Sequence, residues 1–184
     1  MTLTIAKFTI DQYHRMVAAG ILENCSVELL NGEIVEMLSE GAIHADLSSD
    51  AADYLRELLG NRAKVREGHP ITLPETNSEP EPDLAIVRRR DAGYGDRHPY
   101  PSDVFWLIEF SNTSLAKDLE EKSQVYAKSQ IREYWVVNLR QMELVVKQNP
   151  VDGEYRSTVT LTSGDIRPLA FPDLVVSVTQ LLKR

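Results

Sequence analysis

The stretch DVFWLIEFSNTSLAKDLEEKSQVYAK, residues 103–128, decides the fold of this chain. It opens with an unbroken apolar run at residues 104–108, whose β-branched and aromatic side chains predict a strand buried on both faces. The run ends at Glu109, and a carboxylate at the end of a buried strand is costly to ionise unless a partner stabilises it. A loop and a helix are expected to follow, and the apolar face of that helix is marked by Leu115, Leu119 and Tyr126.

Lys122 lies on that same face of the expected helix, three residues after Leu119 and four before Tyr126. Lysine is rarely buried without a partner. The segment therefore directs an acid, Glu109, and a base, Lys122, towards the interior from consecutive elements. Ser111 has the parity of Glu109 along the strand and could bind a water there, whereas Tyr126 is expected in the core.

Composition places the whole chain, residues 1–184, in one domain with a sizeable core. Its 42% hydrophobic and 26% charged residues are typical of a soluble globular protein. The single cysteine excludes an internal disulfide and fits a reducing cytosol, so we expect a cytoplasmic location. No apolar window is long enough for a membrane span, and the N-terminus lacks the apolar core of a signal peptide. The net charge of −8 counts against a nucleic-acid partner held mainly by basic charge, although a local groove or a metal could offset it.

Capping and turn signals predict the elements before the central strand. Thr9 and Gln12 have capping-box spacing and begin a short helix whose inward residues include Val17. Asn31-Gly32, between two strand-like runs, predicts a β-hairpin. A second helix over residues 44–59 carries His44 on its inward face, and short strands are expected at residues 64–67 and 71–73.

Buried runs predict the rest of the sheet. Residues 83–87 form a strand entered through Pro82, and a polar loop over residues 88–103 begins with three arginines, Arg88 to Arg90. Strand, helix and strand with short links form a right-handed unit, so residues 104–111 and 133–138 should be parallel. A hairpin joins residues 142–148 to 154–161, and the fold class is α/β, a mixed sheet flanked by helices.

Asp83 begins one buried strand and Glu109 ends another, so the two carboxylates can meet at one end of the sheet if these strands are neighbours. Two close carboxylates repel, and one takes up a proton unless a cation lies between them. Mg²⁺ typically binds one or two carboxylates and keeps several waters. A nearby lysine such as Lys122 can then orient a water or stabilise developing charge on a phosphate.

Pro82-Asp83 and Glu109-Phe110-Ser111 resemble the PD-(D/E)xK nuclease signature, with Ser111 standing where lysine is usual. A fuller pattern, over residues 9–183, resembles the Uma2 family, also called DUF820, of restriction-endonuclease-like proteins abundant in cyanobacteria. The segments that carry this resemblance are residues 28–33, His44, residues 81–85, 108–111, 114–126 and 133–137.

This resemblance implies a restriction-endonuclease-like core with an added N-terminal helix and hairpin. It also implies Mg²⁺- or Mn²⁺-dependent cleavage of nucleic acid, expected to be DNA, with Asp83 and Glu109 as metal ligands. In that family the lysine has moved to the following helix, a position that Lys122 satisfies. Glu28 could supply a further acid and His44 could contact a phosphate or the metal shell, and a structural role is the alternative for both.

Two other functions are open at this point. The charge of −8 and the serine at position 111 suggest a nuclease-fold protein that binds nucleic acid or a protein without cutting. The other function is that of a structural dimer whose acid–lysine cluster is only a buried ion pair. A homodimer could form through edge strands such as residues 142–148. Glu33, Glu79 and Glu81 are expected to be solvated, and the arginine run is expected at a solvated strand end, where it could touch phosphate.

Overall fold

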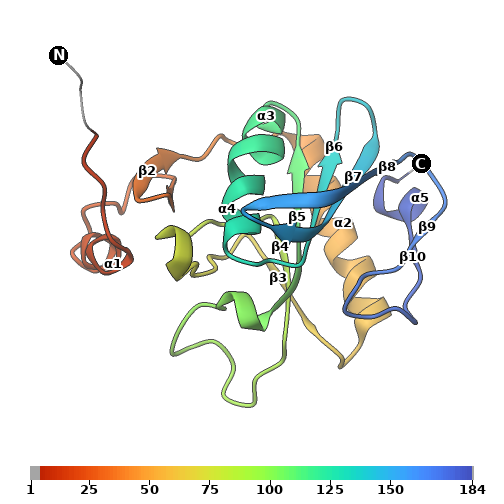
Figure 1. Cartoon of the computed structure of the whole chain (residues 1–184), viewed down its shortest axis with the longest axis horizontal. Helices are drawn as coiled ribbons and strands as arrows, with labels where there is room; N and C mark the ends of the chain where they lie inside the picture. Colours follow the sequence, from red (N-terminus) through yellow and green to blue (C-terminus); the bar gives the residue numbers. More distant parts are fainter. Residues whose placement is uncertain (1–4, 184) are drawn as a thin grey trace.

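A six-stranded mixed sheet forms the centre of the computed structural model, which describes residues 5–183 (Figure 1). Only β5 and β6 run parallel, and each other neighbouring pair is antiparallel. This arrangement confirms the α/β class and the predicted parallel pair. In spatial order the strands are β3 (Lys64–Glu67), β4 (Leu84–Val87), β5 (Val104–Ser111), β6 (Glu133–Asn138), β7 (Glu143–Val151) and β8 (Glu154–Leu161).

The connection from β5 to β6 is helical but irregular. It consists of α3 (Leu115–Lys117), a π-helical turn, η3 (Asp118–Lys122), and α4 (Ser123–Lys128). In the antiparallel pair β4–β5, Leu84 lies opposite Ile108. This register places Asp83, just before β4, beside Glu109, near the end of β5.

Both faces of the sheet are covered, which explains why its central strands are apolar without alternation. Helix α2 (Ala42–Leu59) and the short α5 (Val178–Leu181) pack on one face, against Trp106 and Trp135. Val125 and Tyr126 of α4 pack on the other face. Figure 1 shows these layers, with the small strands β9 (Asp165–Ile166) and β10 (Val176–Ser177) beside α5. Within residues 5–183, no helix has the length and apolar character to cross a membrane.

Helix α1 (Ile10–Ala18) and the hairpin of β1 (Val27–Leu30) and β2 (Glu33–Glu36) lie to one side of the sheet (Figure 1). The predicted capping box at Thr9 is present, and Asn31 and Gly32 have φ of 51° and 80°, as a tight primed turn requires. An isolated bridge between Leu29 and Glu79 attaches the hairpin to the core. This attachment brings the neighbouring Glu28 to the end of the sheet.

Four predicted details of the fold are wrong. Residues 71–73 are not a strand, because Leu73 makes only an isolated bridge to Ser78 before the 3-10 turn η1 (Pro74–Thr76). Val17 is 53% exposed because α1 packs mainly through Tyr13. Helix α2 begins at Ala42, two residues before the predicted start at His44. Residues 142–148 cannot offer a free edge, because β7 lies between β6 and β8. A second 3-10 turn, η2 (Pro101–Asp103), precedes β5.

Candidate functional site

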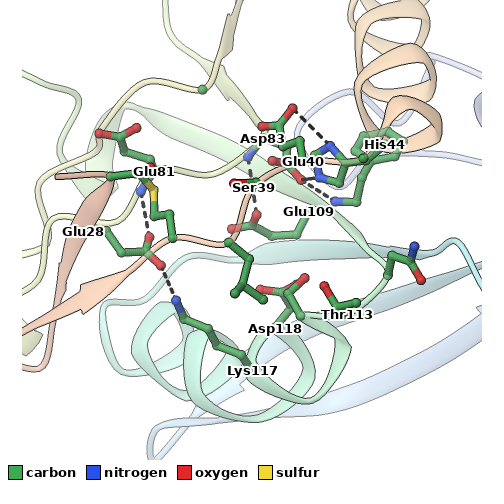
Figure 2. Close-up of a pocket in the computed structure, with 18 of the residues that line it drawn as sticks. Glu28, Ser39, Glu40, His44, Glu81, Asp83, Glu109, Thr113, Lys117 and Asp118 are labelled. Atoms are coloured by element: carbon green, nitrogen blue, oxygen red, sulfur yellow. Dashed lines mark hydrogen bonds and ion pairs between the residues drawn. The ribbon is translucent and has the colours of Figure 1, made fainter. Parts of the chain in front are cut away.

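A cavity of about 650 Å³ lies where β4 begins and β5 ends. Its walls come from the segment after β2, the start of α2, the two strand ends and the segment from α3 to η3. Figure 2 shows acidic side chains from these separate elements facing one another. The cavity brings together all five predicted site residues, which are Glu28, His44, Asp83, Glu109 and Lys122.

Glu109 is at the centre of this group and only 3% exposed. Its Oε1 accepts hydrogen bonds from Lys122 Nζ and Tyr126 Oη, both at 2.9 Å. Its Oε2 accepts the backbone N–H of Asp83 at 3.4 Å. The acid and the base that the sequence pattern directed inward are therefore direct partners, and Tyr126 contacts the site as well as the core.

Burial and charge act in opposite directions on this pair. Burial raises the pKa of Glu109; Lys122 opposes that shift, and the carboxylate of Asp83 adds to it. For Lys122, burial favours the neutral amine, but Glu109 and then Glu28 outweigh it and raise the pKa. The raised pKa favours the ammonium form of Lys122, which can attract an anion.

Asp83 connects the strand end to α2. Its Oδ2 accepts the backbone N–H of Phe110 at 2.6 Å and lies 3.0 Å from His44 Nε2. His44 Nδ1 lies 3.4 Å from Glu40 Oε2. Burial lowers the pKa of His44, but the hydrogen bond to Asp83 and the charges of Asp83 and Glu40 outweigh it, so the pKa is raised.

The cavity wall contains one group of side chains that fits a metal ion. One ligand atom each from Glu40, His44 and Asp83 lies within 4.8 Å of the others, and no other such group occurs among residues 5–183. His44 Nδ1 is buried, and its 3.4 Å contact with Glu40 Oε2 falls short of hydrogen-bond geometry. Carboxylate oxygens suit Mg²⁺ and Mn²⁺, and an imidazole nitrogen is also a common ligand of transition metals. Asp83, one of the two predicted metal ligands, belongs to this group, and so does Glu40, which the sequence pattern did not indicate. Glu109, the other predicted ligand, lies outside the group and accepts a hydrogen bond from Lys122.

Glu28, on β1, is a buried carboxylate shared by two lysines. Its Oε1 accepts from Lys117 Nζ at 2.8 Å, and its Oε2 lies 3.4 Å from Lys122 Nζ. Its Oε2 also accepts the backbone N–H of Glu81 at 3.1 Å. Burial acts to raise the pKa of Glu28, but Lys122 and Lys117 together lower it. Glu28 is therefore an ionised acid of the site.

Two glutamates that were expected in solvent lie wholly or partly inside the protein. Glu81 is half-buried and lines the cavity, where burial and the charge of Glu28 raise its pKa. Glu79 is buried, accepts from Thr72 Oγ1 at 2.8 Å and lies 2.7 Å from His14 Nε2. Both belong to a Pro-rich loop whose packing under the hairpin could not be inferred from composition.

Sequence reasoning also missed Asp118 and Lys117. Asp118 is buried, and its Oδ2 accepts from the hydroxyls of Ser111 and Ser114, both at 2.7 Å. The Ser111 hydroxyl therefore donates to a carboxylate, whereas the sequence pattern suggested that it could bind a water. The four-residue spacing of Ser114 and Asp118 on a helix was the one local signal for this contact.

Carboxylates outnumber ammonium groups around the cavity. The lining acids are Glu28, Glu36, Glu40, Glu81, Asp83, Glu109 and Asp118, and the lining lysines are Lys117 and Lys122. A bound cation would relieve the repulsion among these acids.

The arginine run lies at the other end of β4 from Asp83 and does not line the cavity. Arg90 pairs with Asp96 at 2.8 Å, and the guanidinium of Arg88 lies 5.5 Å from the centre of the Phe105 ring. These contacts fit the expected solvated strand end.

Comparison with known proteins agrees with this fold. The family model Uma2, described as "Putative restriction endonuclease", matches residues 10–179. A solved structure, "a putative nuclease belonging to DUF820 from Anabaena variabilis ATCC 29413", superposes with a TM-score of 0.74 at 14% identity. The match covers 96% of this chain and 98% of that one. No curated protein matches this chain.

Proposed function

The chain belongs to the Uma2 family and has a restriction-endonuclease-like fold, and from this premise we propose that it is a metal-dependent endonuclease. The proposed reaction is hydrolysis of a phosphodiester bond, with DNA as substrate and Mg²⁺ or Mn²⁺ as the ion. One observation carries the proposal. Asp83, Glu109 and Lys122, far apart in sequence, meet in one acidic cavity, with Lys122 donating to Glu109 at 2.9 Å.

Asp83 would hold the ion, with His44 and Glu40 as the nearest further donors and Glu109 on the adjoining strand. When bound, the ion would neutralise these acids, polarise the phosphate and acidify a water. Lys122, kept charged by its two carboxylates, would stabilise negative charge on the phosphate. Glu28 would fix the position of Lys122, and the backbone N–H of Phe110 would fix Asp83.

A cleavage assay on plasmid and linear DNA, with Mg²⁺ and with Mn²⁺, tests this proposal. The wild type should cut, and Asp83→Ala, Glu109→Ala and Lys122→Ala should each lose activity. Arg88→Ala, at the far end of β4, is the matched control and should cut like the wild type. Equal activity in all of these proteins would remove the assigned site.

A nuclease-fold protein that binds without cutting is the second candidate. The observation that favours it is Ser111, which stands at the usual lysine position and donates to Asp118. Calorimetric titration with Mg²⁺ and Mn²⁺ separates the candidates, because a protein that binds neither ion at millimolar concentration would support the binding role.

We also propose a single domain over residues 1–184 and a cytoplasmic location, on the grounds of chain length and the single cysteine. A homodimer that extends the six-stranded sheet by strand pairing would use β3 or β8, the edge strands of that sheet. Light scattering coupled to gel filtration checks the oligomeric state.

A further inference from the structure

Lys117 and Lys122 share one carboxylate but differ in their access to the cavity. Lys117 Nζ donates to Glu28 Oε1 at 2.8 Å, and its side chain is 26% exposed (Figure 2). The Lys122 side chain is 7% exposed and pairs with both Glu109 and Glu28. Lys117 is therefore the ammonium that a molecule entering the cavity can reach.

The π-helical turn explains how both lysines reach Glu28. Residues five apart in a regular α-helix point about 140° away from each other, because each turn takes 3.6 residues. The turn η3, at Asp118–Lys122, begins directly after Lys117, ends at Lys122 and follows the wider i→i+5 pattern. A wider turn reduces the angle between residues five apart, and Lys117 and Lys122 both contact Glu28. Such single π turns are frequent at functional sites.

The ammonium of Lys117 has hydrogen-bonding capacity to spare. A lysine has three N–H donors. Among the described residues, Lys117 Nζ has one hydrogen-bond partner, Glu28, while its side chain lines the cavity. The other lining charges are mostly carboxylates, which repel a phosphate. Of the two lysines among the described lining residues, Lys117 is therefore the one that an approaching anion can reach.

We propose that Lys117 binds a phosphate group of the substrate in this cavity and that the π turn is the feature that places it there. Lys122, enclosed by Glu109 and Glu28, acts further inside. This inference rests on the proposed function, because it assumes a phosphodiester substrate. A purely structural role, in which Lys117 only neutralises Glu28, makes a different prediction about salt dependence.

The test measures binding without cleavage. Fluorescence anisotropy of a labelled DNA duplex is recorded over a series of salt concentrations, with Ca²⁺ in place of Mg²⁺. Lys117→Met should weaken binding about tenfold, as expected for one charge-assisted hydrogen bond. It should also reduce the slope of log affinity against log salt by about one, because one phosphate contact is lost.

Two variants control this measurement. Lys117→Arg keeps the charge and should retain most of the affinity and the full salt slope. Lys64→Met removes the same charge from an exposed position on β3 that does not line the cavity, and it should bind like the wild type. Circular dichroism checks that each variant is folded, and Lys117→Gln serves as a second neutral variant if Lys117→Met is not.

The outcomes separate this inference from the proposed function. If folded Lys117→Met keeps the affinity and salt slope of the wild type, the inference is wrong, even if the wild type cuts DNA. If the wild type binds DNA through Lys117 but does not cleave it with any divalent ion, the phosphate contact stands and the nuclease proposal fails. If the wild type binds neither DNA nor RNA, both fail.

Discussion

Glu109 and Glu133 lie on the adjacent parallel strands β5 and β6, and both carboxylates are buried, at 3% and 0% exposure. Each also borders an apolar run, so the sequence around them looks alike. Their partners differ. Glu109 lines the cavity and accepts from the Lys122 ammonium, whereas Glu133 does not line it.

Glu133 is held by neutral donors. Its Oε1 accepts from Trp135 Nε1 and Gln148 Nε2, both at 2.9 Å, and its Oε2 accepts the backbone N–H of Leu169 at 2.7 Å. Burial raises the pKa of Glu133 despite these hydrogen bonds. Glu133 thus joins β6 to β7 and to the C-terminal segment. The difference teaches that a buried carboxylate marks a candidate site only when a cation and a cavity accompany it.

The largest expected effect is on stability, when the partner of a buried ammonium is removed. Glu109→Ala leaves the Lys122 ammonium buried with Glu28 as its remaining partner, so the free energy of unfolding should fall by about 3–5 kcal/mol. Adding Lys122→Met should recover part of this loss, because the unpaired charge is gone. Urea denaturation measures both. Strictly additive losses in the double variant would contradict a coupled ion pair.

Cleavage should separate the two glutamates next. Glu109→Gln should lower kcat about 10²–10³-fold, because Lys122 loses the partner that positions it. Glu133→Gln should leave kcat and KM unchanged, since Glu133 lies outside the cavity. Initial rates with Mn²⁺ measure both. Equal losses in two folded variants would show that cavity lining does not distinguish these acids.

Metal binding should depend on the cavity that Glu109 lines and should not depend on Glu133. At about one hundred times its Kd, Mn²⁺ should raise the free energy of unfolding by about 2.7 kcal/mol, and EDTA should reverse this. Asp83→Ala should abolish the gain, because Asp83 belongs to the cluster with Glu40 and His44. Glu133→Gln should keep it. Thermal unfolding with and without Mn²⁺ measures this stabilisation. If Mn²⁺ stabilises Asp83→Ala as much as the wild type, the ion binds elsewhere.

The pH dependence of Glu133 gives the smallest effect. Its folded pKa is raised above the ordinary value of 4.5, so the folded state binds its proton more tightly than the unfolded state. The contribution of Glu133 to stability is therefore greatest below pH 4.5 and falls as the pH rises through the folded pKa. The fall is about 1.4 kcal/mol for each unit of pKa difference.

Urea midpoints of the wild type and Glu133→Gln across this pH range measure that fall. The variant should gain stability relative to the wild type as the pH rises. Glu81 and Glu109, whose pKa values are also raised, are present in both proteins and cancel in the difference. A difference independent of pH would refute the assigned cause.

Much of the fold could be predicted because its signals are local. The apolar run before Glu109 predicted the central strand, the Asn31-Gly32 pair predicted the hairpin, and strand–helix–strand order predicted the parallel pair. The neighbouring strands then placed Asp83 beside Glu109. Helical spacing predicted that Lys122 points inward, and in the structure it contacts Glu109.

Only the tertiary structure decided which other charges join the site. Glu40 enters from the segment before α2, Glu81 from a loop under the hairpin, and Lys117 through the i→i+5 turn. Conversely, Glu133 is buried with neutral partners away from the cavity. Alternation and helical period report which way a side chain points within its own element. What it meets there depends on chain segments far away in sequence, and only their packing sets whether a buried acid faces an ammonium, a metal site or an indole.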